Sequence, residues 1–237
     1  MKKLLLFIAI ISAGVLFNSA AFASGNQSKT YNYKDFTAVE VSSGMHLTVT
    51  QSDSYSIEVT ADNEDFEYLK VEKDGNTLKF YFKKDFWSFG WTKHHKIDVN
   101  IKMPALTGAD LSGGSIGDIN MDVSSKRFTA DLSGGSSLNG NLKCANIQFE
   151  LSGGSTVDLS GNGKNLKVEG SGGSIFKLKE FSVVNVDADL SGGSQVTVTM
   201  NGTLNTSQSG GSHLTYYGSA SIGDTDFSGG SGVSKGR

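Results

Sequence analysis

The sequence predicts an all-β protein, a right-handed parallel β-helix of about 20 residues per coil that follows an irregular N-terminal β portion. Apolar and polar residues alternate around a recurring tetrapeptide, as in strands, and no window shows the apolar period of an amphipathic helix. A fixed repeat of this length is typical of a solenoid. The tetrapeptide Ser-Gly-Gly-Ser occurs seven times, beginning at Ser112, Ser133, Ser152, Ser171, Ser191, Ser209 and Ser228.

Residues 1–23 have the pattern of a secretory signal peptide. A basic start, Met1-Lys2-Lys3, precedes an uncharged apolar stretch, and Ala21-Phe22-Ala23 supplies an A-x-A cleavage site. The apolar stretch of about 14 residues is shorter than the roughly 20 residues of a membrane-spanning helix. We therefore expect export to the periplasm, the cell surface or the medium. No transmembrane segment is expected after cleavage.

Residues 24–105 are predicted to form an N-terminal β portion that caps the solenoid of residues 106–237, in one continuous domain from residue 31. Alternation predicts strands at 36–41, 46–50, 55–59, 69–71, 77–82 and 96–103. A turn is expected at Lys73-Asp74-Gly75-Asn76, and Ser43-Gly44 is expected to be a degenerate corner. A cap is needed because exposed strand edges invite aggregation.

An aromatic segment separates the last two of these strands, and we expect it to form a hairpin tip. It contains both tryptophans of the chain, and its candidate ligand-binding residues are Phe86, Trp87, Phe89 and Trp91. Indole rings stack well on sugar rings and are enriched at binding hot spots. The alternative is a hydrophobic plug over the end of the β-helix. His46 and His213 are expected to be ordinary surface histidines.

The Ser-Gly-Gly-Ser repeat is predicted to be a corner between strands. Glycine adopts the positive φ of a tight corner at little cost. A flexible linker is the usual meaning of such tracts, but here alternating apolar residues flank every copy. The serines are expected to hydrogen-bond to one another along the axis. The single Cys144 alternates with polar neighbours, which predicts a buried, inert thiol.

An acidic residue stands two positions before six of the seven tetrapeptides. Since the residue between is usually apolar, these acids are predicted to face solvent in one stacked column. Two interpretations are open: a solvated acidic stripe, or a weak ladder of Ca²⁺ sites, because Ca²⁺ prefers several carboxylate oxygens. No other cofactor is expected. The acids are Asp110, Asp131, Glu150, Glu169, Asp189 and Asp226.

Charge and motif content exclude several classes of function. The formal net charge is −3 without a basic run, so nucleic acid is not an expected partner. Catalysis by paired carboxylates needs two acids in different environments, whereas the repeat offers six that are nearly equivalent. We expect no enzyme. A carbohydrate-active enzyme, similar to polysaccharide lyases or hydrolases, is the alternative.

Three sequence features together resemble the DUF2807 family, described as putative auto-transporter adhesin, head GIN domain. They are the opening segment 36–44, the link Met103-Pro104-Ala105-Leu106 and the repeated [DE]-L-S-G-G-S. The resemblance covers about residues 31–233. It implies a β-helix of the pectin-lyase kind without catalytic residues, and a role in adhesion. Many relatives look like lipoproteins, whereas this chain lacks the lipid-accepting Cys.

These observations predict an exported, non-catalytic adhesion or binding module of the bacterial cell envelope. Its expected partner is an extracellular glycan or a surface protein. A self-assembling structural envelope protein, a homo-oligomer joined through stacked ends, is the further alternative to an enzyme.

Overall fold

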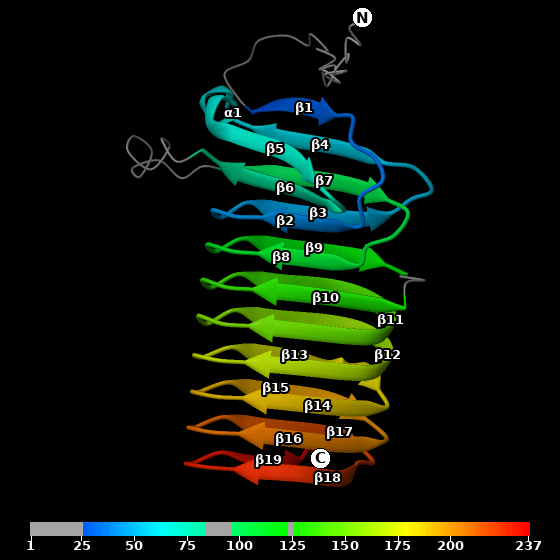
Figure 1. Ribbon diagram of the computed structural model, residues 1–237, viewed down its shortest axis with the longest axis vertical. Helices are drawn as coiled ribbons and strands as arrows, with labels where there is room; N and C mark the ends of the chain where they lie inside the picture. The colour runs from blue at the N-terminus through cyan, green and yellow to red at the C-terminus, as the bar shows by residue number, and fades with distance from the viewer. Residues whose placement is uncertain (1–25, 84–95, 123–125) are drawn as a thin grey trace, which may run out of the picture.

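The computed structural model describes residues 26–83, 96–122 and 126–237. In these ranges, 19 strands join in one continuous sheet that winds into a rod, with one short helix at the N-terminal end (Figure 1). The rod is a β-solenoid of about seven turns with about 19 residues per turn. The predicted all-β fold and parallel β-helix are confirmed.

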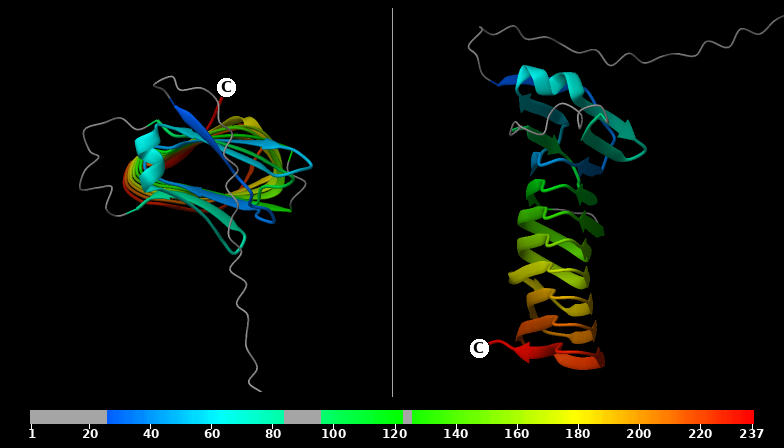
Figure 2. Two further views of the ribbon diagram at one scale, coloured as in Figure 1. Left: turned by 90° about the horizontal axis from the view of Figure 1, so that it is seen from above. Right: turned by 90° about the vertical axis from the view of Figure 1, so that its left-hand side faces the viewer.

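Each coil consists of two strands joined by a Ser-Gly-Gly-Ser corner, and the stacked coils form two walls around an oval interior (Figure 2). We call the strands before the corners the first wall and those after them the second wall. The first wall contains β8 (Gly108–Leu111), β10 (Arg127–Leu132), β14 (Asn185–Leu190), β16 (Thr203–Gln208) and β18 (Ser221–Phe227). The second wall contains β9 (Ile116–Met121), β13 (Ile175–Val183), β15 (Gln195–Met200), β17 (His213–Gly218) and β19 (Gly232–Lys235). Two long strands, β11 (Ser137–Leu151) and β12 (Thr156–Gly170), pass from the second wall into the first wall of the next coil.

Successive coils pair in parallel, with equivalent repeat positions opposite one another. Leu132 lies opposite Leu111 on one side and Leu151 on the other. Because side chains alternate along a strand, this register places every second residue inside the rod. The interior is a continuous apolar core, as the alternation predicts. One of its columns consists of Leu138, Val157, Phe176, Val196 and Leu214, all buried.

The corners have the positive φ predicted for their glycines, but in two forms. In the three corners nearest the N-terminus both glycines have positive φ, for example 64° at Gly134 and 78° at Gly135. In the four later corners only the first glycine does, for example 69° at Gly192. There the N–H of the second glycine, Gly193, donates to the carbonyl of Gly172 in the preceding corner at 2.8 Å.

The sequence predicts that the corner serines hydrogen-bond to one another along the axis. The structure shows a different arrangement. The second serine of the corner is buried in six of the seven copies, and in all seven its hydroxyl donates to the carbonyl of the first serine of the same corner. The distance from Ser155 Oγ to Ser152 O is 2.7 Å. The expectation is wrong because this side chain turns inward, where the backbone carbonyl is the nearest acceptor.

The rod continues above the first Ser-Gly-Gly-Ser corner. Strands β2 (Ala38–Val41) and β3 (His46–Gln51) stack on β8 and β9, and φ is positive at Ser43 and Gly44, which confirms the degenerate corner. One more pair, β6 (Thr77–Phe82) and β7 (Asp98–Met103), stacks in parallel on β2 and β3.

Antiparallel strands and a helix cover the N-terminal end, in a curled half-barrel of mixed strand direction. Strand β4 (Ser56–Ala61) pairs with β7, β1 (Gln27–Tyr31) with β4, and β5 (Leu69–Asp74) with β6. Helix α1 (Asn63–Tyr68) connects β4 to β5, and the Lys29 ammonium lies 4.0 Å from the centre of the Phe66 ring. The sequence does not reveal α1, because six residues are too few to show a helical period.

The predicted signal peptide and the four aromatic candidates Phe86, Trp87, Phe89 and Trp91 lie outside the described residues. The strands that flank the aromatic segment, β6 and β7, pair with β2 and β5 and with β3 and β4, not with each other. They lie in opposite walls, in contrast to the two strands of the expected hairpin. Within the described ranges, no helix has the length and apolar character needed to cross a membrane.

Candidate binding surface on the first wall

Three columns of outward-facing side chains run along the first wall, parallel to the rod axis. Their members lie opposite one another in the strand register. The acidic column contains Glu40, Asp110, Asp131, Glu150, Glu169, Asp189, Ser207 and Asp226. The middle column contains Thr129, Gln148, Lys167, Asp187 and Asn205. The asparagine column contains Arg127, Asn146, Asn165, Asn185 and Thr203.

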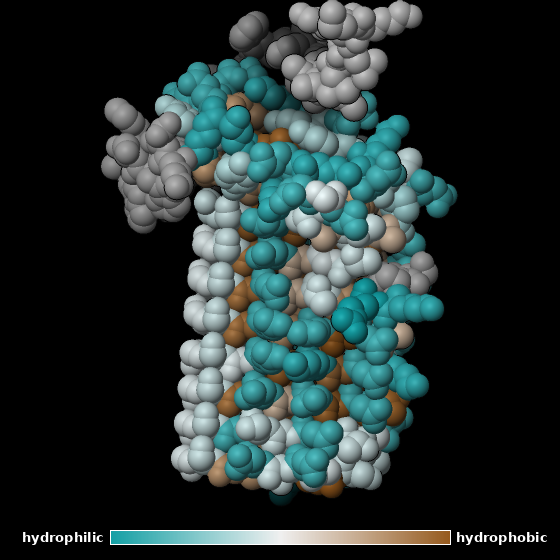
Figure 3. Space-filling view, in the orientation of Figure 1, coloured by the Kyte–Doolittle hydropathy of each residue, from teal (hydrophilic) through white to brown (hydrophobic). Residues whose placement is uncertain are grey.

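The acidic column confirms the alignment predicted for six carboxylates and adds a seventh, Glu40. Glu40 lies opposite Asp110 and Lys79. It belongs to the coil with the degenerate corner, and its place two residues before Ser42-Ser43-Gly44 is the signal that could have identified it. Figure 3 shows a hydrophilic strip along this face, separated from the pale column of corner serines and glycines by a narrow line of hydrophobic residues.

Burial and mutual repulsion raise the pKa of two acids in the column. Burial raises the pKa of Asp110, and the neighbouring carboxylates of Glu40 and Asp131 add to the effect. Burial likewise raises the pKa of Asp131, with further contributions from Glu150 and Glu169. Asp110 and Asp131 therefore ionise less readily than an isolated aspartate, as expected for partly buried carboxylates beside like charges.

Neighbouring donors offset part of this repulsion. Gln148 Nε2 donates to Glu150 Oε1 at 2.7 Å, and Lys167 Nζ lies 2.6 Å from Glu169 Oε1. At the N-terminal end Lys79 Nζ lies 3.5 Å from Glu40 Oε2. These donors come from the middle column and from β6, so the first wall is a connected polar surface.

Five acids of the column, from Asp110 to Asp189, and the first serines of four corners, from Ser133 to Ser191, line a shallow groove of about 420 Å³. No cluster of three or more His, Cys, Asp or Glu side chains within the described residues has an arrangement that could hold a metal ion. The Ca²⁺ hypothesis for the acidic column stays a prediction.

The asparagine column forms a hydrogen-bonded ladder across successive coils. Asn165 Nδ2 donates to Asn146 Oδ1 at 2.8 Å, and Asn185 Nδ2 donates to Asn165 Oδ1 at 3.0 Å. The ladder ends where the backbone N–H of Thr203 donates to Asn185 Oδ1 at 3.1 Å. Because each amide is held from both sides, the column is a rigid row of polar groups.

A second groove, which we call the amide groove, lies between the asparagine and middle columns. Its volume is about 490 Å³, and the buried residues Ile147, Leu166 and Val186 lie beneath it. The sequence analysis did not identify this groove. The sequence does contain a pattern that could have indicated it, because an asparagine stands six residues before each of three successive tetrapeptides.

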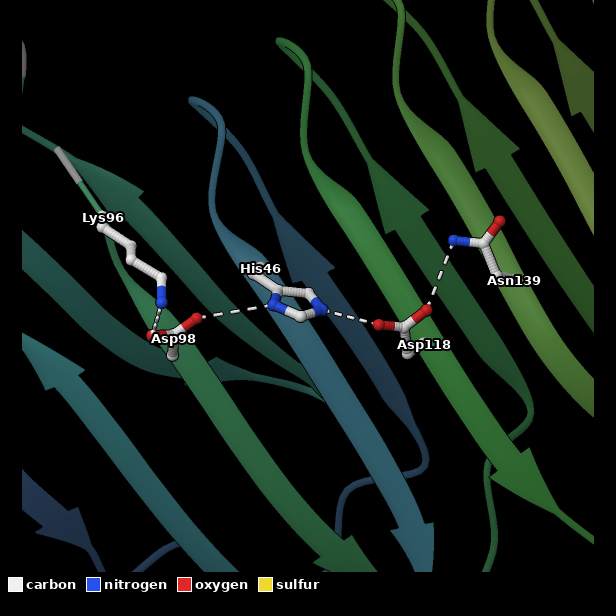
Figure 4. A network of polar contacts seen from close by, with 5 residues as sticks. All are labelled: His46, Lys96, Asp98, Asp118 and Asn139. Atoms are coloured by element: carbon white, nitrogen blue, oxygen red, sulfur yellow. Dashed lines mark hydrogen bonds and ion pairs between the residues drawn. The ribbon is translucent and has the colours of Figure 1, made fainter. Parts of the chain in front are cut away.

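The second wall carries a polar network around His46, which is not the isolated surface histidine that the sequence predicts (Figure 4). His46 Nε2 lies 2.6 Å from Asp118 Oδ2, and Nδ1 lies 3.4 Å from Asp98 Oδ1. Lys96 and Asn139 contact the same two carboxylates. The network joins β7, β3, β9 and β11, and thereby connects four successive levels of the second wall. Elsewhere, Cys144 is buried as predicted.

Residues 35–220 match a family described as putative auto-transporter adhesin, head GIN domain, DUF2807. The chain belongs to this family. The resemblance carried by the repeated [DE]-L-S-G-G-S and the segment 36–44 is thereby confirmed. No curated protein matches the chain.

Solved bacterial structures share the fold at low sequence identity. A putative adhesin from Bacteroides fragilis has a TM-score of 0.79 and 16% identity, over 90% of this chain and 98% of that one. A putative adhesin from Parabacteroides merdae has a TM-score of 0.68 and 17% identity, over 90% and 97%. A protein described as a putative lipid binding protein from Parabacteroides distasonis has a TM-score of 0.67 and 17% identity, over 90% and 97%. At these identities the likeness establishes the fold alone.

Proposed function

We propose that the protein is an exported, non-catalytic adhesion module of the bacterial cell envelope that binds glycans. One observation carries the proposal: two polar grooves run parallel to the rod axis on the outer face of a single wall. Membership of a family of putative adhesins supports it.

The repetition of the wall suits an extended polymer. Neighbouring coils are about 4.8 Å apart, so each column repeats its donors and acceptors at that interval along the axis. A polymer laid along a groove can therefore meet the same kind of side chain several times. Many weak contacts of this kind add up to stable attachment when they are made together.

The acidic column argues against a glycosidase. Acids in adjacent coils are about 4.8 Å apart, close to the roughly 5 Å of a retaining carboxylate pair. Such a pair needs one protonated and one ionised member, which requires different environments. The pKa values of Asp110 and Asp131 are instead both raised, in each case chiefly by burial.

The test combines binding and turnover in one experiment. The purified protein is incubated with insoluble polysaccharides, and both the protein retained in the pellet and the reducing ends released into solution are measured. Retention without release of reducing ends is expected. Release that grows with time and enzyme concentration would overturn the non-catalytic assignment, and absence of retention on every polysaccharide would oppose glycan binding. Fractionation of the producing cells tests export.

Self-association is a second candidate function, favoured by the last coil. Every residue of β18 is exposed, including Ile222 at 51% and Phe227 at 44%. Ile222→Ser/Phe227→Ser is expected to abolish any concentration-dependent increase in mass during sedimentation. Val184→Ser is the matched control, because Val184 is 38% exposed in the middle of the rod. A mass that stays monomeric at all concentrations in the unsubstituted protein would oppose this function.

A further inference from the structure

The amide groove has a regular, balanced set of polar groups. It crosses five successive strands, β10, β11, β12, β14 and β16, which at about 4.8 Å per step gives a length of about 19 Å. One side is the asparagine column and the other is the middle column from Gln148 to Asn205. This length accommodates several consecutive units of a polymer that lies along the axis.

The asparagine side of the groove is organised before any ligand arrives. An amide group has two N–H donors and an oxygen with two lone pairs. The ladder uses one donor of each of Asn165 and Asn185, and one lone pair of each of their oxygens. Each amide keeps a second donor and a second lone pair. Because the ladder already fixes these side chains, a ligand that bonds to them loses little conformational entropy.

The charges around the groove select against an anionic ligand. Within it, Lys167 is paired with Glu169 at 2.6 Å, and Asp187 lies beside Lys167 in the register. Arg127 lies at one end of the groove, away from the paired Lys167. The acidic column stands two residues further along the same strands, about 6.6 Å away. A polymer with carboxylate or sulfate groups would therefore lie beside Asp131, Glu150, Glu169 and Asp189 and be repelled.

We propose that the amide groove binds an uncharged, hydroxyl-rich glycan laid along the rod axis, a proposal that rests on the adhesion function above. Sugar hydroxyls both donate and accept hydrogen bonds, which matches amides that present one of each. The side chains of Lys167 and Asp187 would bound the glycan on the side nearer the acidic column. The buried row of Ile147, Leu166 and Val186 provides the base of the site.

The test measures binding to immobilised dextran, mannan and xylan as uncharged probes, and to polygalacturonate and heparin as anionic probes. The groove variant is Lys167→Ala/Asp187→Ala. The matched control is Asp158→Ala/Lys177→Ala, which removes an acid and a base of the second wall whose charged atoms are 3.9 Å apart. The melting temperature of each variant shows whether it is folded.

We expect the unsubstituted protein to bind at least one uncharged probe. The groove variant should lose at least about tenfold in affinity for that probe, which corresponds to about 1.4 kcal/mol of binding free energy. The control variant should bind as tightly as the unsubstituted protein. Equal binding by all three proteins would overturn the groove while leaving adhesion intact. Binding only to the anionic probes would overturn the ligand class. No binding to any probe would overturn both this proposal and glycan recognition as the function.

Glu150→Gln/Glu169→Gln tests the charge argument separately. Neutralising two members of the acidic column is expected to increase binding to polygalacturonate, because it removes negative charge beside the groove. If polygalacturonate binding does not increase, the acidic column does not determine the ligand class.

Discussion

The two glycines of a later corner are expected to respond very differently to the same substitution. Gly192 has φ of 69°, and a Cβ there would lie 2.6 Å from the carbonyl oxygen of Gly172. The left-handed conformation alone costs an alanine about 1–2 kcal/mol, and the contact with a backbone atom adds to this. We expect Gly192→Ala to lower the free energy of unfolding by about 2–3 kcal/mol.

Gly193 is the matched control one residue away. Its φ is not in the left-handed region, and a Cβ there would lie 3.6 Å from the same oxygen, an ordinary contact. Gly193→Ala is expected to be neutral or to stabilise by up to about 1 kcal/mol, because alanine restricts the unfolded chain.

Thermal unfolding followed by circular dichroism measures the difference between the two variants. For a chain of this size, 2–3 kcal/mol corresponds to a melting temperature lower by roughly 4–12 °C. Equal melting temperatures for Gly192→Ala and Gly193→Ala would refute the assignment of the turn conformation to the first glycine.

Three further predictions concern the acidic column, the core and the ladder. The raised pKa of Asp131 means that its ionised form destabilises the fold above that pKa, and that this penalty disappears as the pH falls toward the ordinary value of 3.8. Asp131→Asn should therefore raise the melting temperature at pH 7 and have no effect at about pH 3. An equal increase at both pH values would contradict the raised pKa of Asp131 as the cause. Phe176→Ala should cost about 3–5 kcal/mol in urea unfolding, because the ring is fully buried. Adding Gly170→Ala should restore part of the loss, since a Cβ at Gly170 would lie 2.8 Å from that ring; no recovery would contradict the packing. Asn165→Ala should lower the free energy of unfolding by about 1–3 kcal/mol, because it removes two hydrogen bonds of the ladder. Asn162 is exposed, and Asn162→Ala should leave the free energy of unfolding unchanged in the same assay.

The solenoid could be predicted because its information is local and repeated. Each Ser-Gly-Gly-Ser copy marks a corner, and two-residue alternation around it assigns the inner and outer faces. The same register places Asp131 beside Glu150 without any knowledge of distant contacts. The hydrogen-bond partner of the second corner serine could not be predicted in this way. The Ser155 hydroxyl can reach either a serine of a neighbouring corner or the carbonyl of Ser152, and its inward rotamer selects the carbonyl.

The cap and the polar networks depend on contacts between distant segments. His46 meets Asp118 across 72 positions of sequence, because residues 52–107 are inserted between two coils that then stack directly. No local pattern reports that juxtaposition. The amide groove is an intermediate case: the asparagines recur in the repeat, but the groove exists only because the middle column stands beside them at each level.

A glycan-array screen of the purified protein tests the central claim, adhesion through glycan recognition, most directly. Trp87→Ala/Trp91→Ala, folded by its melting temperature, is screened alongside to test the aromatic segment as a second recognition element. We predict that the unsubstituted protein binds a defined class of uncharged glycans, and that the variant binds it more weakly. An array on which the unsubstituted protein binds nothing would contradict the account, and self-association through β18 would then become the leading function.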